Sequence, residues 1–215
     1  MTPAAVLFDC DGVVVDSEPA TFALIAEDLT ARGLTLSLPE MERLFLGGTI
    51  ALVGEKARAL GADIPESWTA DFYEALYTRL AEGTPLIPGI ETVLDALDSA
   101  GIPYAIGSNG TARKMRVTLG QHPAIAARFA GRAFSGQDLG MLKPAPDLYL
   151  HAARALNADP ARCVVVEDSA TGARAARAAG MRCMGYAPHG PNPALAATGA
   201  TLFPRMEDLP RLLGL

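Results

Sequence analysis

The stretch Ala4-Ala5-Val6-Leu7-Phe8-Asp9-Cys10-Asp11-Gly12 opens the chain and decides its fold. An apolar run followed by acids and a glycine predicts a buried strand that ends in a polar turn. Side chains alternate along a strand, so Asp9 and Asp11 point one way and Cys10 the other. Two carboxylates so close together repel each other, and a hard cation such as Mg²⁺ relieves that conflict. The stretch therefore predicts a catalytic acid pair with a metal ion, or else an ordinary strand end with an Asp-Gly turn.

Composition narrows the class of protein. The chain has 215 residues, of which 50% are hydrophobic and 6% aromatic, enough for a sizeable aliphatic core. A net charge of -6 without any Lys/Arg-rich run argues against nucleic acid as a partner. We expect no membrane span, because no run of about 20 apolar residues occurs, and no secretory signal. The 3 cysteines predict free, buried thiols in a reducing compartment. We therefore expect a cytoplasmic protein, with its oligomeric state left open and a monomer plausible.

Strand-like and helical segments alternate through most of the chain. The strand-like runs are nearly continuous in apolar residues, which is typical of parallel strands covered on both faces. They lie at 6–9, 104–108, 132–135, 163–168, 182–186 and 200–203. Helical patterns lie between them, at 89–100, 111–119, 146–156 and 170–179. This alternation predicts an α/β fold with a Rossmann-like, doubly wound parallel sheet.

One segment breaks that rhythm. Residues 17–83 show helical periodicity and no strand, with helices expected at 21–32, 39–46, 50–60 and 67–82. We expect these helices to form an α-helical cap domain at 16–83, inserted into a core domain made of 1–15 and 84–215. Ordinary crossover helices are the alternative, which the length of the segment disfavours.

Three more polar sites follow predicted strands. Ser108-Asn109-Gly110 offers a hydroxyl and backbone N–H groups to a phosphate, or forms a turn and helix cap. Lys143 is held between Leu142 and the prolines 144 and 146, which suits a fixed phosphate-binding cation, with a solvated loop lysine as the alternative. Glu167-Asp168-Ser169 brings a second acid pair, or a helix cap. The carboxyl ends of central strands meet at one crevice, so we expect a single cation-and-phosphate site.

These motifs carry a family resemblance. Asp9-Cys10-Asp11-Gly12-Val13, Ser108-Asn109, Lys143-Pro144-Ala145-Pro146 and Val166-Glu167-Asp168-Ser169 together resemble the haloacid dehalogenase superfamily of phosphotransferases. The flanking residues 13–18 and 171–176 are similar to the subgroup that contains β-phosphoglucomutase and sugar-phosphate phosphatases. The stretch 108–152 looks like bacterial phosphatases of the 6-phosphogluconate type. The resemblance spans essentially the whole chain and is specific for the superfamily, but not for the substrate.

The resemblance implies catalytic roles for four residues. Asp9 would attack phosphorus and form an aspartyl-phosphate. Asp11 would protonate the leaving oxygen and then activate the water that hydrolyses the intermediate. Ser108 and Lys143 would hold the transferring phosphoryl group, with Asn109 beside them as a further substrate-binding residue.

The resemblance also implies a Mg²⁺ cofactor. Asp9, the backbone carbonyl of Asp11 and Asp168 would hold the ion, with Glu167 close by. Substrate recognition would fall to cap residues, and the candidates are Glu18, Gly47, Thr49 and Arg79.

Several activities of the superfamily can be weighed. Dehalogenases and phosphonoacetaldehyde hydrolases lack the second acid, so Asp11 argues against both. Phosphonoacetaldehyde hydrolases also use a cap lysine to form a Schiff base, and Lys56 is the only lysine in the cap segment. A hexose-phosphate mutase needs a cap cation for its second phosphate. The cap loop at 47–51 has none, and Arg79 is the alternative source.

We therefore expect a Mg²⁺-dependent phosphatase acting on a small phosphorylated metabolite, a sugar or sugar-acid phosphate. A β-phosphoglucomutase-like mutase is the alternative enzyme. A non-catalytic protein that binds a phosphometabolite on the same scaffold is the alternative from another class.

Overall fold

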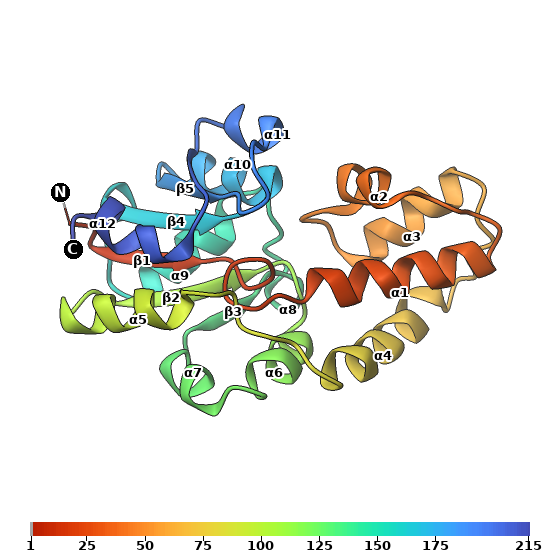
Figure 1. The fold of residues 1–215 in the computed structure, drawn as a ribbon, viewed down its shortest axis with the longest axis horizontal. Helices are drawn as coiled ribbons and strands as arrows, with labels where there is room; N and C mark the ends of the chain where they lie inside the picture. Colours follow the sequence, from red (N-terminus) through yellow and green to blue (C-terminus); the bar gives the residue numbers. More distant parts are fainter. Residues whose placement is uncertain (1) are drawn as a thin grey trace.

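The computed structural model describes residues 2–215, which build an α/β fold around a parallel six-stranded sheet (Figure 1). The strand order is β3-β2-β1-β4-β5-β6, so the chain runs outward from β1 in one direction and then returns to β4 to run in the other. This change of direction between β1 and β4 is where doubly wound folds place their ligands. The strands are β1 (Ala5–Phe8), β2 (Tyr104–Ser108), β3 (Ala133–Ser135), β4 (Cys163–Glu167), β5 (Arg182–Tyr186) and β6 (Thr201–Phe203). The predicted fold class is confirmed.

The strands form where the continuous apolar runs predicted them. Every residue of β1, β2 and β4 is buried, because helices cover both faces of the sheet. The bounds of β2 and β5 coincide with the predicted ones, and the other strands are shorter by a residue at an end or shifted by one residue. Strand ends fall where polar residues begin, so such small shifts are expected.

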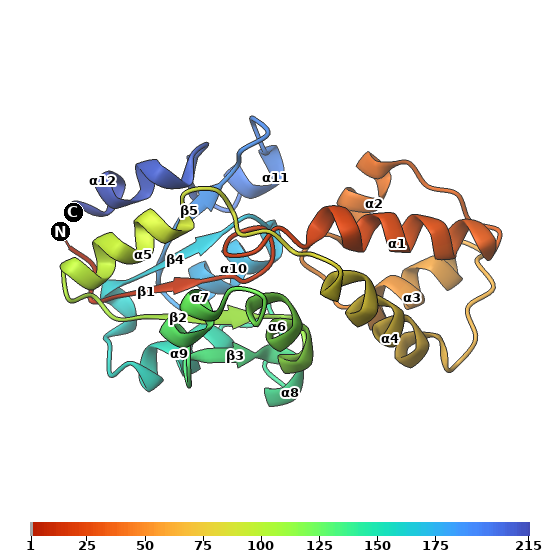
Figure 2. The same ribbon diagram turned by 60° about the horizontal axis from the view of Figure 1, so that its bottom comes forward.

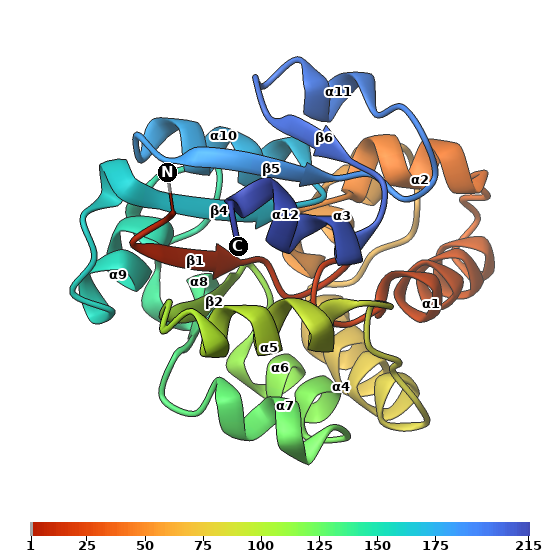
Figure 3. The same cartoon turned by 60° about the vertical axis from the view of Figure 1, so that its left-hand side comes forward.

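Two helical layers enclose the sheet, as Figure 3 shows. Apolar side chains of alternate strand residues point into one layer or the other and form two separate hydrophobic clusters. One face is covered by α5 (Ile90–Ser99), α6 (Ala112–Leu119), α7 (Pro123–Arg128) and α12 (Leu209–Leu213). The other is covered by α9 (Asp147–Ala155), α10 (Ala170–Ala178) and α11 (Pro193–Ala196).

Several short helical segments were not predicted from the sequence. These are α7, α8 (Gly136–Leu139), α11, α12, and the 3₁₀ turns η1 (Pro160–Arg162) and η2 (Met206–Asp208). Each has at most 6 residues. A segment that short does not repeat its apolar positions often enough to reveal a helical period.

Four helices stand apart from the sheet and form a group that we call the cap helices. They are α1 (Glu18–Ala31), α2 (Leu38–Phe45), α3 (Ile50–Ala59) and α4 (Trp68–Ala81). They bury a hydrophobic cluster of their own around Trp68 and Phe72. The carboxyl ends of the strands point toward this group, as Figure 2 shows.

Two neighbouring segments connect the cap helices to the sheet. The backbone N–H of Asp16 donates to Pro85 at 2.8 Å, and that of Ile87 donates to Val14 at 3.0 Å. The two connections therefore run side by side. The division into domains at 15/16 and 83/84, and a capping role for 16–83, remain our proposal. None of the helices in residues 2–215 has the length and apolar character needed to cross a membrane.

Candidate active site

Asp9 is the first residue after the central strand β1. Its backbone N–H donates to Val166 of β4 at 2.9 Å, which fixes it between the two central strands. Its carboxylate accepts a hydrogen bond from the Lys143 ammonium at 2.8 Å. Burial raises the pKa of Asp9 to about 7. The positive charge of Lys143 acts to lower this pKa, and the negative charge of Glu167 acts to raise it further.

Lys143 is the buried cation of the site. Its side chain is 3% exposed and bridges Asp9 and Glu167, at 2.8 and 2.7 Å. Glu167 is fully buried and also accepts from Tyr149 and Ser169. Burial acts to lower the pKa of Lys143, but the two carboxylates outweigh it and raise that pKa above its ordinary value. Lys143 is therefore a permanent positive charge held in place from two sides.

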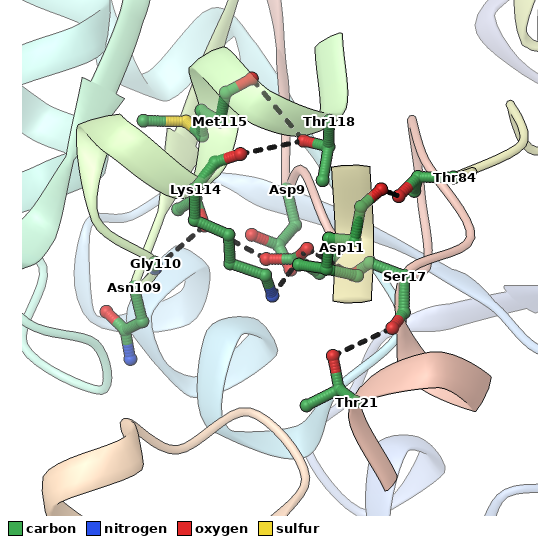
Figure 4. Close-up of polar contacts among 12 residues, drawn as sticks. Asp9, Asp11, Ser17, Thr21, Thr84, Asn109, Gly110, Lys114, Met115 and Thr118 are labelled. Carbon is green, nitrogen blue, oxygen red and sulfur yellow. Dashed lines mark hydrogen bonds and ion pairs between the residues drawn. The ribbon is translucent and has the colours of Figure 1, made fainter. Parts of the chain in front are cut away.

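Asp11 is held by a different set of donors, shown in Figure 4. Lys114 reaches it from α6 at 2.8 Å, and the Ser17 hydroxyl donates to the same carboxylate. The Ser108 hydroxyl lies 3.4 Å from its other oxygen. Burial alone would raise the pKa of Asp11, but Lys114 and Ser17 outweigh it and hold that pKa below its ordinary value. The two acids of the motif therefore differ in environment, which is what separate roles require.

The sequence interpretation missed three of these contacts. Lys114 is one of only three lysines in the chain, and that scarcity was the signal that could have marked it as a site residue. Ser17 directly precedes α1, where a serine is typical of a helix cap. Its hydroxyl makes no cap hydrogen bond and donates to the carboxylate of Asp11 instead. Tyr149 carried no signal, because a tyrosine in an amphipathic helix is most often a packing residue.

The loop after β2 joins three parts of the site. The Ser108 hydroxyl accepts from the N–H of Gly110 at 2.9 Å, close to the N-terminus of α6. Asn109 accepts from the N–H of Lys143 at 2.8 Å. Its side-chain amide lies 3.3 Å from the backbone carbonyl of Gly47, in the loop between α2 and α3. Asn109 thus links the lysine loop to the cap helices.

The carboxylates of Asp9, Glu167 and Asp168 form a cluster suited to a metal ion. One oxygen of each lies within 4.8 Å of the others. Burial raises the pKa of Asp168 well above its ordinary value, and neighbouring acids add to the effect. Gly12, at φ +74°, leaves room for this carboxylate, since a Cβ there would lie 2.1 Å from Oδ2 of Asp168. An all-oxygen donor set with excess negative charge fits Mg²⁺. The Asp11 side chain lies outside the cluster.

A cavity opens between this floor and the cap helices. Its empty volume, including its opening to solvent, is about 790 Å³, which suits a small metabolite. Most of the predicted site residues line it, namely Asp9, Asp11, Glu18, Gly47, Thr49, Ser108, Asn109, Lys143 and Asp168.

Two predicted residues do not line the cavity. Glu167 lies behind Lys143, where it anchors the ammonium. Arg79 forms an ion pair with Glu27 of α1 at 2.9 Å, on a solvent-exposed face of the cap helices. The geometry therefore gives no support to the prediction that Arg79 binds substrate or supplies a cation for a second phosphate.

Cys10 is a packing residue, as the alternation along the strand predicted. It is 1% exposed and belongs to the hydrophobic cluster on one face of the sheet. Burial raises the pKa of its thiol well above the ordinary value, so it is poorly suited to act as a nucleophile.

The acid cluster predicts a measurable response to Mg²⁺. At a concentration about 100 times its Kd, the ion should stabilise the protein by about 2.7 kcal/mol, which raises Tm by roughly 5–10 °C in a chain of this size. Asp168→Asn should abolish this rise. Without metal, the Tm of the same variant should be no lower than that of the wild type. The substitution removes one carboxyl group from a buried cluster of acids that repel one another.

Differential scanning fluorimetry with Mg²⁺ or with a chelator measures these shifts. Asp71→Asn, an exposed position on α4, is the matched control and should respond as the wild type does. An equal Mg²⁺ shift in Asp168→Asn would place the metal site elsewhere.

Comparison with known proteins agrees with the geometry. Residues 3–180 match the family described as haloacid dehalogenase-like hydrolase. The chain is 30% identical over 210 residues to the 6-phosphogluconate phosphatase of Escherichia coli (strain K12), covering 97% of this chain and 93% of the relative. It is 35% identical over 178 residues to hexitol phosphatase A of the same bacterium, covering 81% and 78%.

A solved structure supports the same assignment. The conserved haloacid dehalogenase-like protein of unknown function from Agrobacterium tumefaciens str. C58 matches with a TM-score of 0.84 at 33% identity, over 98% of this chain and 97% of that one. The resemblance noted from the sequence motifs is confirmed.

Proposed function

This chain belongs to the haloacid dehalogenase-like hydrolases, and on that basis we propose that it is a Mg²⁺-dependent phosphatase of a small phosphorylated metabolite, of the sugar or sugar-acid phosphate kind. One observation carries the proposal. Asp9, Ser108, Lys143 and Asp168, which are far apart in the chain, line a single cavity at the carboxyl ends of the central strands. The phosphatases among its relatives support the reaction class.

Asp9 is the proposed nucleophile. Lys143 holds its Oδ1 at 2.8 Å, which leaves Oδ2 to attack the phosphorus of a bound ester. The Asp9–phosphorus bond forms as the bond from phosphorus to the leaving oxygen breaks, and the product is an aspartyl-phosphate. Lys143 and the hydroxyl of Ser108 then face the charge on the phosphoryl oxygens. Positioning and charge neutralisation of this kind supply most of the catalysis in phosphoryl transfer.

Asp11 is the proposed acid and base. Lys114 and Ser17 hold its pKa below the ordinary value, so Asp11 must first take up a proton from solvent, which it then gives to the departing alkoxide. The resulting carboxylate, held by Lys114 and Ser17, then removes a proton from the water that attacks the aspartyl-phosphate. Phosphate leaves, and Asp9 returns to its starting form.

The metal site serves the same chemistry. Asp9 and Asp168 are the residues best placed to hold Mg²⁺, since Glu167 already accepts hydrogen bonds from Lys143 and Tyr149. When bound, the ion would neutralise charge on the phosphoryl oxygens and on the acid cluster. The cap helices would exclude bulk water from the cavity while the phosphoryl group passes to Asp9.

An Asp11→Asn substitution should separate the two halves of the reaction. Asn neither gives nor takes the proton, so hydrolysis of an alkyl phosphate should fall by about 10²–10⁴-fold. An activated aryl phosphate needs no help at its leaving oxygen. We expect this ester to give a rapid burst of the phenol, followed by slow turnover, because water activation is still impaired.

Stopped-flow absorbance with p-nitrophenyl phosphate measures the burst. Asp95→Asn, on the exposed surface of α5, is the control and should behave as the wild type. Unimpaired turnover of both kinds of ester by Asp11→Asn would contradict the assigned role.

A phosphate-release screen over many phosphorylated metabolites, with and without Mg²⁺, tests the function itself. Release from at least one ester, dependent on the ion, is the expected result. Binding without release from any ester would point instead to a non-catalytic phosphometabolite-binding protein. Conversion between isomers without net phosphate release would identify a mutase, which the cavity does not favour because the described residues on its cap side include no cation.

A further inference from the structure

Among residues 2–215, those that line the cap side of the cavity carry no positive charge. Twelve of its lining residues, between Thr21 and Leu76, come from the cap helices and the α2–α3 loop, and none of them is basic or acidic. They are Thr21, Phe22, Ile25, Phe45, Leu46, Gly47, Gly48, Thr49, Ile50, Val53, Tyr73 and Leu76. With the phosphate on the acid floor, this wall would contact the leaving group of the substrate.

Both cations that line the cavity are already paired. Lys143 is fixed between Asp9 and Glu167, at 2.8 and 2.7 Å. Lys114 is 12% exposed and pairs with Asp11 at 2.8 Å. Lys143 already serves the phosphoryl group, and Lys114 lies beside Asp11 on the floor of the cavity. Neither lysine therefore lies on the cap wall, where a second anionic group of the substrate would need one.

Four carboxyl groups line the cavity beside the two lysines. Asp9, Asp11 and Asp168 lie on the floor, and Glu18 lies at the start of α1 where the cap helices begin. The lining thus has more carboxylates than ammonium groups. A carboxylate or a second phosphate on the leaving group would find no cation on the cap wall to neutralise it.

The same wall suits an uncharged leaving group that carries hydroxyls. Thr49 accepts from the N–H of Leu52 and keeps its own hydroxyl hydrogen for a ligand. The Thr21 hydroxyl donates to the backbone carbonyl of Ser17, so its lone pairs remain able to accept a hydrogen bond from a ligand. Between these hydroxyls lie apolar side chains such as Phe22 and Ile50, which can contact the carbon chain. A few hydroxyls on an apolar wall are typical of sites that bind neutral polar ligands.

We propose that the substrate is the monophosphate ester of an uncharged polyhydroxy compound, a polyol or a neutral sugar, and that sugar-acid phosphates and bisphosphates are poor substrates. This inference rests on the phosphatase function proposed above and narrows it. The juxtaposition that carries it is a cap wall without cations opposite a floor whose two lysines are already paired.

Matched pairs of esters test the inference. Glucitol 6-phosphate carries an uncharged hydroxymethyl group where 6-phosphogluconate carries a carboxylate, and the two are otherwise identical. In the same way, 2-hydroxyethyl phosphate is the uncharged counterpart of 2-phosphoglycolate. We expect kcat/KM for the uncharged member to exceed that for the acid by about ten-fold or more. The pairs are run beside a broad panel of phosphate esters that includes bisphosphates.

A pair of variants tests the physical cause. Thr49→Lys places a cation on the cap wall, and Thr49→Met is a control of similar length without the charge. Both lose the same helix cap at the start of α3. Thr49→Lys should narrow the preference for the uncharged member by about five-fold or more relative to Thr49→Met, since only the charge differs between them.

The outcomes separate this inference from the function on which it rests. If no ester in the panel releases phosphate, the phosphatase proposal fails. If esters are hydrolysed but the best substrate carries a second anionic group, or the acid member of a pair is turned over as well as its partner, the phosphatase proposal stands and this inference is overturned. A best substrate with an uncharged leaving group supports both.

Discussion

Replacing Asp9 with Asn should abolish phosphate release, by about 10⁴-fold or more, as expected when a nucleophile is removed. The amide cannot attack phosphorus, yet it has nearly the same shape and can still accept from Lys143. The fold should survive, because burial already raises the pKa of Asp9 to about 7 and a neutral group at this position removes a buried charge. We therefore expect a Tm in chelator equal to or above that of the wild type. Phosphate-release assays and thermal melts on the same preparation measure both effects.

The control for Asp9→Asn is its neighbour. Cys10→Ala truncates a side chain that packs in the hydrophobic cluster and points away from the cavity. It should cost some stability, as core truncations do, but keep turnover within a few-fold of the wild type. Full activity in Asp9→Asn, or loss of activity in Cys10→Ala with an intact fold, would remove Asp9 from the role of nucleophile.

Lys143→Met should have the second largest effect, and it should act on activity and stability together. Without the ammonium, the carboxylates of Asp9 and Glu167 face each other in the interior with no cation between them. Losing one partner of a buried pair costs about 3–5 kcal/mol, measurable by urea unfolding in chelator. Phosphate release should fall by about 10³-fold, because the variant also loses the fixed positive charge opposite the phosphoryl oxygens.

The stability loss in Lys143→Met should depend on pH with a definite sign. Asp9 already has a raised pKa in the folded protein, and removing Lys143 raises it further. A carboxyl whose folded pKa lies above its unfolded one weakens the fold as pH rises and the group ionises. The deficit should therefore be largest near pH 8 and shrink toward about pH 5. A deficit that grows on acidification would contradict this picture of the site.

Lys56→Met is the matched control for Lys143→Met. Lys56 lies on α3, where its ammonium donates to the backbone of Leu44, and it does not line the cavity. Its loss should leave phosphate release within a few-fold of the wild type. Strong inactivation of Lys56→Met would favour a reaction through a cap lysine, as in phosphonoacetaldehyde hydrolases.

The sequence was most informative where physical chemistry acts locally. Continuous apolar runs predicted the strands of the sheet, since strands covered on both faces cannot be polar. The residues after β1, β2 and β4 were predicted to meet because parallel strands of one sheet end at the same edge. Asp9, Ser108 and Asp168 do line one cavity.

The sequence was least informative about contacts between elements that share no edge of the sheet. Lys114 sits on α6, and whether its side chain reaches Asp11 or solvent depends on how that helix turns over the sheet. Arg79 shows the reverse case, since the rotation of α4 turns it toward Glu27 and away from the cavity. Helical periodicity tells which face of a helix is buried, but it does not tell which neighbour an individual polar side chain meets.

The identity of the nucleophile is the central claim, and direct chemical trapping of its intermediate tests it. Asp11→Asn, mixed with p-nitrophenyl phosphate and Mg²⁺ and quenched in the burst, should carry an acyl phosphate that borohydride reduces to an alcohol. Mass spectrometry of the digested protein should then find homoserine in place of aspartate at position 9, and only in samples that received the ester. A burst of phenol with position 9 unmodified, or with the phosphoryl group on another residue, would contradict the account.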